Sequence, residues 1–118
     1  MGRLSTHVLD TTHGRPASGM VIELLEARPE GGWNAVKTIV TNADGRTDGP
    51  VLGPEEMRTG RFQLRFHVGA YFRTAGVDLP DPAFLEHVPI QFGIADASGH
   101  YHVPLLCTPW SYSTYRGS

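Results

Sequence analysis

The sequence lacks the features that would place the chain in a membrane or hold it together with covalent bonds. Its single cysteine, Cys107, excludes an intrachain disulfide and suits a reducing compartment. No apolar run approaches the ~20 residues that a membrane span needs. The first residues contain no apolar segment of the kind found in a secretory signal. We therefore expect a cytoplasmic protein with no membrane partner.

Neither sign of charge is in clear excess. The chain has 10 Lys and Arg against 12 Asp and Glu, which gives a net charge of -2 at pH 7. Nucleic acids and acidic membrane surfaces favour a basic protein surface, so we expect no nucleic-acid partner. With 118 residues, 40% of them hydrophobic, the sequence predicts one globular domain that spans residues 1–118.

In place of long apolar runs, the sequence has short segments in which polar and apolar residues alternate. The clearest is RFQLRFHV at 61–68, where Phe62, Leu64 and Phe66 share one face of a strand. Further strands are expected at residues 4–10, 20–27, 33–41, 88–95, 100–108 and 111–115, with residues 70–74 continuing into a neighbouring strand. Turn signals recur about every ten residues, which favours an antiparallel β-sandwich of seven or eight strands.

One short helix is expected in the chain, at residues 81–87. Asp81 suits the N-cap and Pro82 suits the first turn, where its missing N–H costs nothing. Pro89 would then end the helix.

The strand expected at residues 100–108 has apolar side chains on both faces. Alternation places His102 and Leu106 on one face, and Val103 and Leu105 on the other. One face should pack on the core of the sandwich. We therefore expect a partner subunit to cover the other face.

Histidines are the residues of this sequence best suited to chemistry. His100 and His102 share a strand face, and together with His7 or His13 they could bind a metal ion. The alternative is acid–base work without a metal, because histidine titrates near neutral pH and can activate water. The chain contains no nucleophile elbow and no phosphate-binding glycine loop.

Arg46 follows an Asp-Gly turn and could hold a fixed positive charge against a developing oxyanion. The alternative is an ordinary solvated turn arginine. We expect His13, His67 and His87 to be packing or solvent-exposed residues.

The end of the sequence is dense in polar groups. The strand expected at residues 111–115 runs directly into Tyr115, Arg116, Gly117 and Ser118. This segment is either an ordinary last strand with Tyr115 as a packing residue, or a tail that contributes to a site.

Five motifs in this order resemble the 5-hydroxyisourate hydrolases, which are transthyretin-related enzymes of purine breakdown. They are STHVLD at 5–10, GRPA at 14–17, the turn at 41–46, HYHVPLL at 100–106 and YRGS at 115–118. The resemblance runs the length of the chain. The terminal YRGS separates these hydrolases from transthyretin itself, which shares their fold and binds thyroid hormone.

The resemblance implies a transthyretin-like antiparallel β-sandwich of about eight strands with one short helix. It also implies a homotetramer whose sites lie in a channel between dimers. The implied reaction, in urate catabolism, is the hydrolysis of 5-hydroxyisourate to 2-oxo-4-hydroxy-4-carboxy-5-ureidoimidazoline. Water activated by histidine would open the cyclic amide, with no metal and no organic cofactor.

The resemblance also implies roles for particular residues. His7 and His102 would handle the water and the proton, and which of them is the base stays open. Arg46 would hold the substrate and its developing negative charge, and Tyr115 would orient the ring or the water. The carboxylate of Ser118 would fix a histidine tautomer or contact the substrate. Of these catalytic residues, His7, Arg46 and Tyr115 would also bind the substrate.

Two other classes of function compete with this interpretation. A transthyretin-like carrier would bind a small molecule in the same channel without turnover, and a metal-dependent hydrolase would lose its activity to a chelator. For Arg116 we expect a neighbouring carboxylate as its partner, in a contact that holds the tail.

Overall fold

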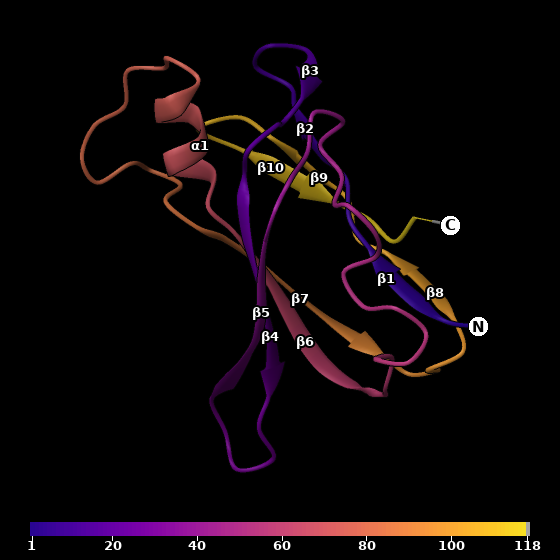
Figure 1. Ribbon diagram of the computed structural model, residues 1–118. Helices are drawn as coiled ribbons and strands as arrows, with labels where there is room; N and C mark the ends of the chain where they lie inside the picture. The colour runs from indigo at the N-terminus through magenta and orange to yellow at the C-terminus, as the bar shows by residue number, and fades with distance from the viewer. Residues whose placement is uncertain (118) are drawn as a thin grey trace.

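The computed structural model describes residues 1–117, which form two layers of β-structure and one short helix (Figure 1). In chain order the elements are β1 (Arg3–Ser5), β2 (Val8–Asp10), β3 (Arg15–Pro16), β4 (Val21–Ala27), β5 (Trp33–Val40), β6 (Gly60–Phe66), α1 (Val68–Thr74), β7 (Val88–Ile94), β8 (His100–His102), β9 (Leu105–Cys107) and β10 (Tyr112–Thr114). The β-sandwich expected from the sequence is confirmed.

One layer is a regular sheet with the strand order β5-β4-β6-β7, antiparallel at every pairing. On β6 the side chains of Phe62, Leu64 and Phe66 are fully buried, and Arg61 and Arg65 lie on the other face. The alternation expected for residues 61–68 is therefore confirmed as far as Phe66, and Val68 begins α1 instead. One face of this sheet therefore packs against the core.

The other layer is built around two interrupted strands, with β3 antiparallel to β2 at one edge and β10 antiparallel to β9 at the other. Residues 4–10 form β1 and β2, and residues 100–107 form β8 and β9, so the ten segments amount to eight strands. β1 pairs with β8 and β2 with β9, in both cases parallel. The antiparallel pattern expected for the sandwich therefore does not extend to these pairs. The amides of Val103 and Leu105 donate to the carbonyls of Ser5 and His7 at 2.9 Å, so hydrogen bonding continues past the breaks.

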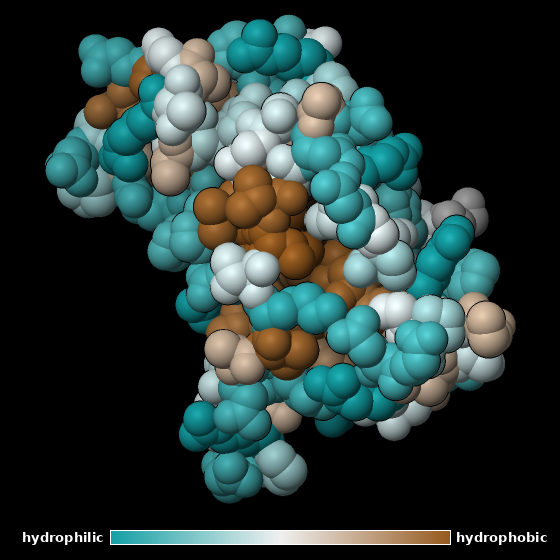
Figure 2. Space-filling view, viewed as in Figure 1, coloured by the Kyte–Doolittle hydropathy of each residue, from teal (hydrophilic) through white to brown (hydrophobic). Residues whose placement is uncertain are grey.

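The hydrophobic core lies between the two layers. Its fully buried members come from both: Leu4, Val8 and Leu105 from the interrupted layer, and Ile22 and Leu24 from the regular sheet. Figure 2 shows hydrophobic side chains gathered over the middle of one face, with hydrophilic side chains around them. The opposite faces of β1 and β8 are left free for polar residues.

The helix is not where the sequence signals placed it. Residues 81–87 form bends without a helix, and residues 70–74, expected as strand, lie in α1. Val68, Tyr71 and Phe72 recur at the spacing of one helical face and are buried in the core. This burial decides the structure of the segment, although its valine and aromatic residues individually favour strands.

The loop at 81–87 gains its order from Glu86 rather than from a helix cap at Asp81. The Glu86 carboxylate accepts hydrogen bonds from the amide of Ala83 and from the Arg73 guanidinium of α1. The loop also packs on Gly69, where a Cβ would lie 3.1 Å from the carbonyl oxygen of Leu85. Within residues 1–117, no helix is long and apolar enough to cross a membrane.

Candidate active site

The first strand presents its partly exposed polar side chains on one face. Leu4, Thr6 and Val8 are buried, and Ser5 and His7 between them are partly exposed on the other side. This places His7 opposite Thr6 and Val8, as the alternation predicts. The same face is continued by the neighbouring strand β8.

His102 lies directly beside Ser5, because the two are paired in the register of β1 and β8. The Oγ of Ser5 is 2.8 Å from Nδ1 of His102. The imidazole is half-buried, with one nitrogen held by the neighbouring strand. Sequence distance gives no hint of this contact, since 97 positions separate the two residues.

The tail crosses His102 on its other side. Gly117 forms an isolated antiparallel bridge with His102 and donates its N–H to the His102 carbonyl at 2.8 Å. A Cβ at position 117 would lie 2.5 Å from Cδ2 of the imidazole. Glycine is therefore required for the backbone to pass this close to the ring.

His7 is held by the turn that precedes Arg46. Its Nε2 lies 2.9 Å from the carbonyl oxygen of Asp44. A carbonyl only accepts hydrogen bonds, so Nε2 of His7 must carry the proton. The remaining nitrogen, Nδ1, is the one that can gain or lose a proton in chemistry.

The turn itself is fixed on β2. The Oδ1 of Asn42 accepts the amides of Asp44 at 2.9 Å and Arg46 at 3.2 Å. Gly45 has φ +73°, and a Cβ there would lie 2.3 Å from the carbonyl oxygen of Val8. Glycine thus allows the turn to pack against β2. The position of Arg46 is fixed by this turn.

A recess of about 300 Å³ opens at this face, and we call it the basic recess because two arginines line it. Its lining residues are Arg3, Ser5, Thr6, Arg46, Thr47, Gly49 and Pro50. Neither histidine ring is part of the lining, but Ser5 connects the recess to His102. A small anionic molecule would meet two guanidinium groups here.

The surroundings keep His102 neutral. Burial lowers the pKa of His102 below its ordinary value, and the positive charges of Arg46, His7 and Arg3 lower it further. A hydrogen bond to the backbone of Ser5 acts in the opposite direction without reversing the shift. The structure thus brings His7, Arg46 and His102 close enough to interact electrostatically, and at neutral pH His102 is an uncharged base.

Tyr115 is placed differently from these three residues. Its side chain is 60% exposed and lines another recess, of about 270 Å³, together with Phe92 and Tyr101. Tyr101 is on the core-facing side of β8, opposite His102. Within residues 1–117, Tyr115 does not line the basic recess, and Ser118 lies outside the described residues.

Arg116 holds the tail, and among residues 1–117 its partners do not include the carboxylate that we expected. Its guanidinium donates to the carbonyl of His100 at 3.1 Å and lies over the ring of Tyr101, 4.2 Å from the centroid. The partners found for it within residues 1–117 are thus a carbonyl and an aromatic face. Both are suitable for arginine, which stacks on aromatic rings.

The other histidines are engaged elsewhere. Nδ1 of His13 lies 2.6 Å from the buried carboxylate of Asp10, and Nε2 of His67 lies 2.7 Å from Glu23. Nε2 of His100 donates to the carbonyl of Met1 at 2.8 Å. Among residues 1–117, no group of three His, Cys, Asp or Glu side chains is arranged to hold a metal ion.

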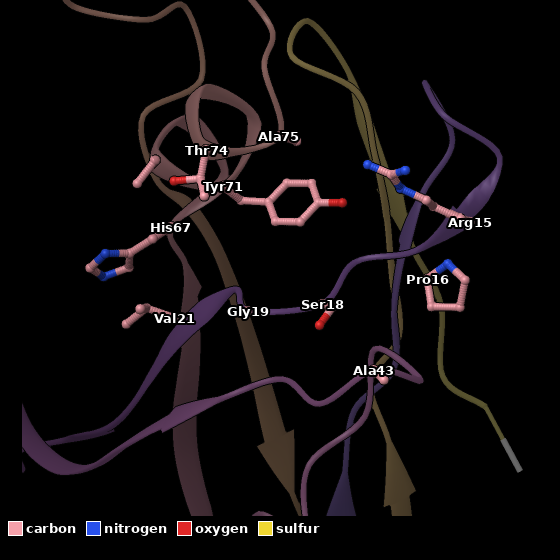
Figure 3. A pocket seen from close by; sticks show the side chains of 11 residues that line it. Arg15, Pro16, Ser18, Gly19, Val21, Ala43, His67, Tyr71, Thr74 and Ala75 are labelled. Carbon is pink, nitrogen blue, oxygen red and sulfur yellow. The ribbon is translucent and has the colours of Figure 1, made fainter.

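A larger recess, of about 580 Å³, lies beside α1 and contains none of the expected site residues. Figure 3 shows the Tyr71 hydroxyl pointing toward Arg15 across it, with His67 at the other side. The Tyr71 hydroxyl donates to Asp10 at 2.8 Å, and His67 is bound to Glu23. Because these polar groups already have partners within the chain, we place the candidate active site at the basic recess.

Two residues of this site were missed by reasoning from the sequence, Ser5 and Arg3. The signal was available in part, since alternation puts both on the same strand face as His7. Their relation to His102 was not available, because it depends on the parallel register between β1 and β8.

The fold and the site together define a transthyretin-like β-sandwich with histidines and arginines gathered on the outer face of one layer. The sequence model of the HIUase/Transthyretin family matches residues 4–117. The chain belongs to this family.

Several relatives are similar over nearly their full lengths. "5-Hydroxyisourate hydrolase 2" of Rhizobium meliloti is 58% identical, over 99% of this chain and 97% of its own. The 5-hydroxyisourate hydrolase of Ralstonia nicotianae is 54% identical over 100% of both chains. Among solved structures, 5-hydroxyisourate hydrolase of Klebsiella pneumoniae has a TM-score of 0.80 at 34% identity, over 100% of this chain and 94% of that one. Transthyretin of Sparus aurata has a TM-score of 0.86 at 27% identity, over 98% and 96%.

Proposed function

We propose that this protein hydrolyses 5-hydroxyisourate to 2-oxo-4-hydroxy-4-carboxy-5-ureidoimidazoline, a step of urate catabolism. The observation that carries the proposal is the gathering of His7, His102 and Arg46 on one face, in a chain whose relatives are 5-hydroxyisourate hydrolases. Transthyretin of Sparus aurata shares the fold but is only 27% identical, so the fold alone does not favour a carrier.

Opening a cyclic amide needs an activated water, a stabilised oxyanion and a proton for the leaving nitrogen. We assign the water and the proton to the two histidines, and the oxyanion to the guanidinium of Arg46. Arg46 and His7 also hold the substrate. This set of groups can perform the reaction with neither a metal nor an organic cofactor.

Tyr115 and Ser118 complete the proposed site as the part supplied by the tail. Gly117 lies against the imidazole of His102, which brings the tail to the proposed base. Tyr115 would orient the substrate or water with its hydroxyl, and the Ser118 carboxylate would contact a histidine or the substrate. A variant that lacks residues 116–118 tests this role. If the tail is catalytic, activity is lost while the domain stays folded. If the tail only packs, the variant loses thermal stability and keeps its activity.

A homotetramer is part of the proposal. Large hydrophobic side chains are exposed at Val40, Trp110, Tyr112 and Tyr115, and contact with other copies of the chain would bury them. Light scattering coupled to size-exclusion chromatography measures the mass directly. A monomeric mass would contradict this part. The cytoplasmic location stays a prediction, to be checked by cell fractionation.

The decisive experiment generates 5-hydroxyisourate from urate and follows its ultraviolet decay in buffer containing EDTA. The compound decays by itself, so the rate without protein is subtracted. Decay that accelerates in proportion to protein concentration supports the hydrolase and argues against a metal. Decay at the background rate from a folded protein would contradict the proposal and favour a carrier.

A further inference from the structure

The two histidines of the site are held by different partners, and this difference bears on which of them is the base. His7 has its Nε2–H bound to the Asp44 carbonyl. His102 has Nδ1 next to the hydroxyl of Ser5, at 2.8 Å. In a neutral imidazole only one nitrogen has a proton, and the partner of one nitrogen decides the role of the other.

We propose that Ser5 is a positioning residue that holds the proton of neutral His102 on Nδ1, so that Nε2 is the base that activates water. This inference rests on the proposed function for its catalytic consequence. The tautomer itself can be measured without turnover.

The contact with Ser5 also decides which nitrogen of His102 is free for chemistry. A hydroxyl can donate to Nδ1 or accept from it, so the 2.8 Å distance alone leaves both tautomers possible. Because Nδ1 is taken by the hydroxyl of Ser5, Nε2 is the nitrogen left to take a proton from water, and it can do so only if it has no proton in the neutral ring. The proton then belongs on Nδ1, with Oγ of Ser5 as its acceptor.

The charges around the ring leave Nε2 without a proton. Arg46 on its turn, His7 on the first strand and Arg3 on β1 all disfavour a second proton on His102. A Cβ added at Gly117 would lie 2.5 Å from Cδ2 of His102, and Cδ2 is bonded to Nε2. Nε2 is thus on the side of the ring that the tail crosses, where the water would be held.

The proposed step balances in atoms and protons. As the water oxygen bonds to the amide carbon, Nε2 of His102 takes one of its protons and the carbonyl electrons move to an oxyanion beside Arg46. The C–N bond then breaks as the carbonyl reforms. The leaving nitrogen takes a proton from Nδ1 of protonated His7, and the proton on His102 returns to His7 or to solvent. One water is consumed overall.

The first measurement is the ring nitrogen spectrum of protein labelled with ¹⁵N-histidine, with His102 assigned by comparison with His102→Asn. Nitrogen shifts distinguish a protonated from an unprotonated ring nitrogen in neutral imidazole. We expect the proton on Nδ1 of His102 in the wild type and a mixture of tautomers in Ser5→Ala. A proton on Nε2 in the wild type would overturn the inference, whether or not the protein is active.

The second measurement is the kinetics of Ser5→Ala beside Ser5→Thr, which keeps a hydroxyl. We expect Ser5→Ala to lower kcat about tenfold, a part of the 10²–10⁴ that general-base catalysis supplies, with KM little changed. Ser5→Thr should recover most of kcat. Ser98→Ala is the matched control, because Ser98 bonds to Asp96 in the turn before β8 and does not line the basic recess.

These outcomes separate the two proposals. An inactive wild type contradicts the proposed function, and the nitrogen spectrum still decides the tautomer. An active wild type with an unchanged kcat in folded Ser5→Ala overturns the role of Ser5 and leaves the hydrolase intact.

Discussion

The two layers of the sandwich differ in regularity, and the less regular layer carries the chemistry. The sheet β5-β4-β6-β7 pairs through strands of seven and eight residues, with one register shift between β4 and β5 at Leu24/Leu25. The layer containing β1, β2, β8 and β9 is divided into strands of three residues. Near its breaks lie His7 and His102, with the Arg46 turn docked on β2. A continuous sheet stabilises the molecule, and an interrupted one lets side chains and turns approach each other.

The largest effect that tests this comparison is expected from His102→Asn. The variant removes the proposed base but keeps a half-buried polar side chain of similar size. We expect turnover to fall by about 10²–10⁴, the usual contribution of general acid–base catalysis, while the fold survives. His100→Asn, on the same face of β8, is the control and should keep its activity. Near-wild-type turnover in His102→Asn would sink the assignment.

A change in the regular sheet should have the opposite signature. Leu64 is fully buried at the centre of β6, and Leu64→Ala leaves a cavity there. We expect a loss of about 2–5 kcal/mol in unfolding free energy, seen as a lower thermal midpoint. The kcat of the protein that remains folded should change little. If kcat fell as strongly as stability, the separation of the layers into stability and chemistry would be wrong.

Gly117→Ala sharpens the comparison at the tail. The new Cβ would lie 2.5 Å from Cδ2 of His102, so the backbone of the tail must move away from the ring. We expect kcat to fall about tenfold, again a part of the general-base contribution, with little change in the thermal midpoint. Gly93→Ala is the control, since the nearest atom to its Cβ would be 3.9 Å away. Equal effects of the two substitutions on kcat would mean that the tail has no special relation to His102.

The smallest effect is expected from Arg3→Gln. Arg3 is one of the positive charges that lower the pKa of His102, after burial, Arg46 and His7. Removing it weakens the penalty on the protonated ring, so the pKa of His102 rises. The acid limb of the profile of kcat/KM against pH should therefore move to higher pH. Arg61→Gln on β6 is the control, and an acid limb that does not move in Arg3→Gln would remove Arg3 from the site.

The regular sheet could be predicted from the sequence, because its alternation of polar and apolar residues is a local property. The helix could not. Asp81 and Pro82 gave local signals at the wrong place, and α1 forms because Tyr71 and Phe72 reach the core. Tertiary burial outweighed the local propensity there.

The sequence predicted which residues belong to the candidate site better than it predicted how they are arranged. Arg46 and His102 followed from turn chemistry and from the histidine pattern, and the family resemblance added His7. Ser5 and Arg3 were not found, because they join the site through the parallel register of β1 with β8. The placement of Tyr115 in a separate recess also follows from the path of the tail and not from any local pattern.

The parallel pairing of β1 with β8 has a consequence for the order in which the protein is made. Ser5 leaves the ribosome 97 residues before its partner His102, so the first strand must wait for nearly the whole chain to be synthesised. The sheet β5-β4-β6-β7 draws on residues 21–94 and can pair earlier. Because long-range pairing is slow to form, the catalytic face is expected to be the last part of each new molecule to assemble. An unfinished chain would have the regular sheet but no complete catalytic face.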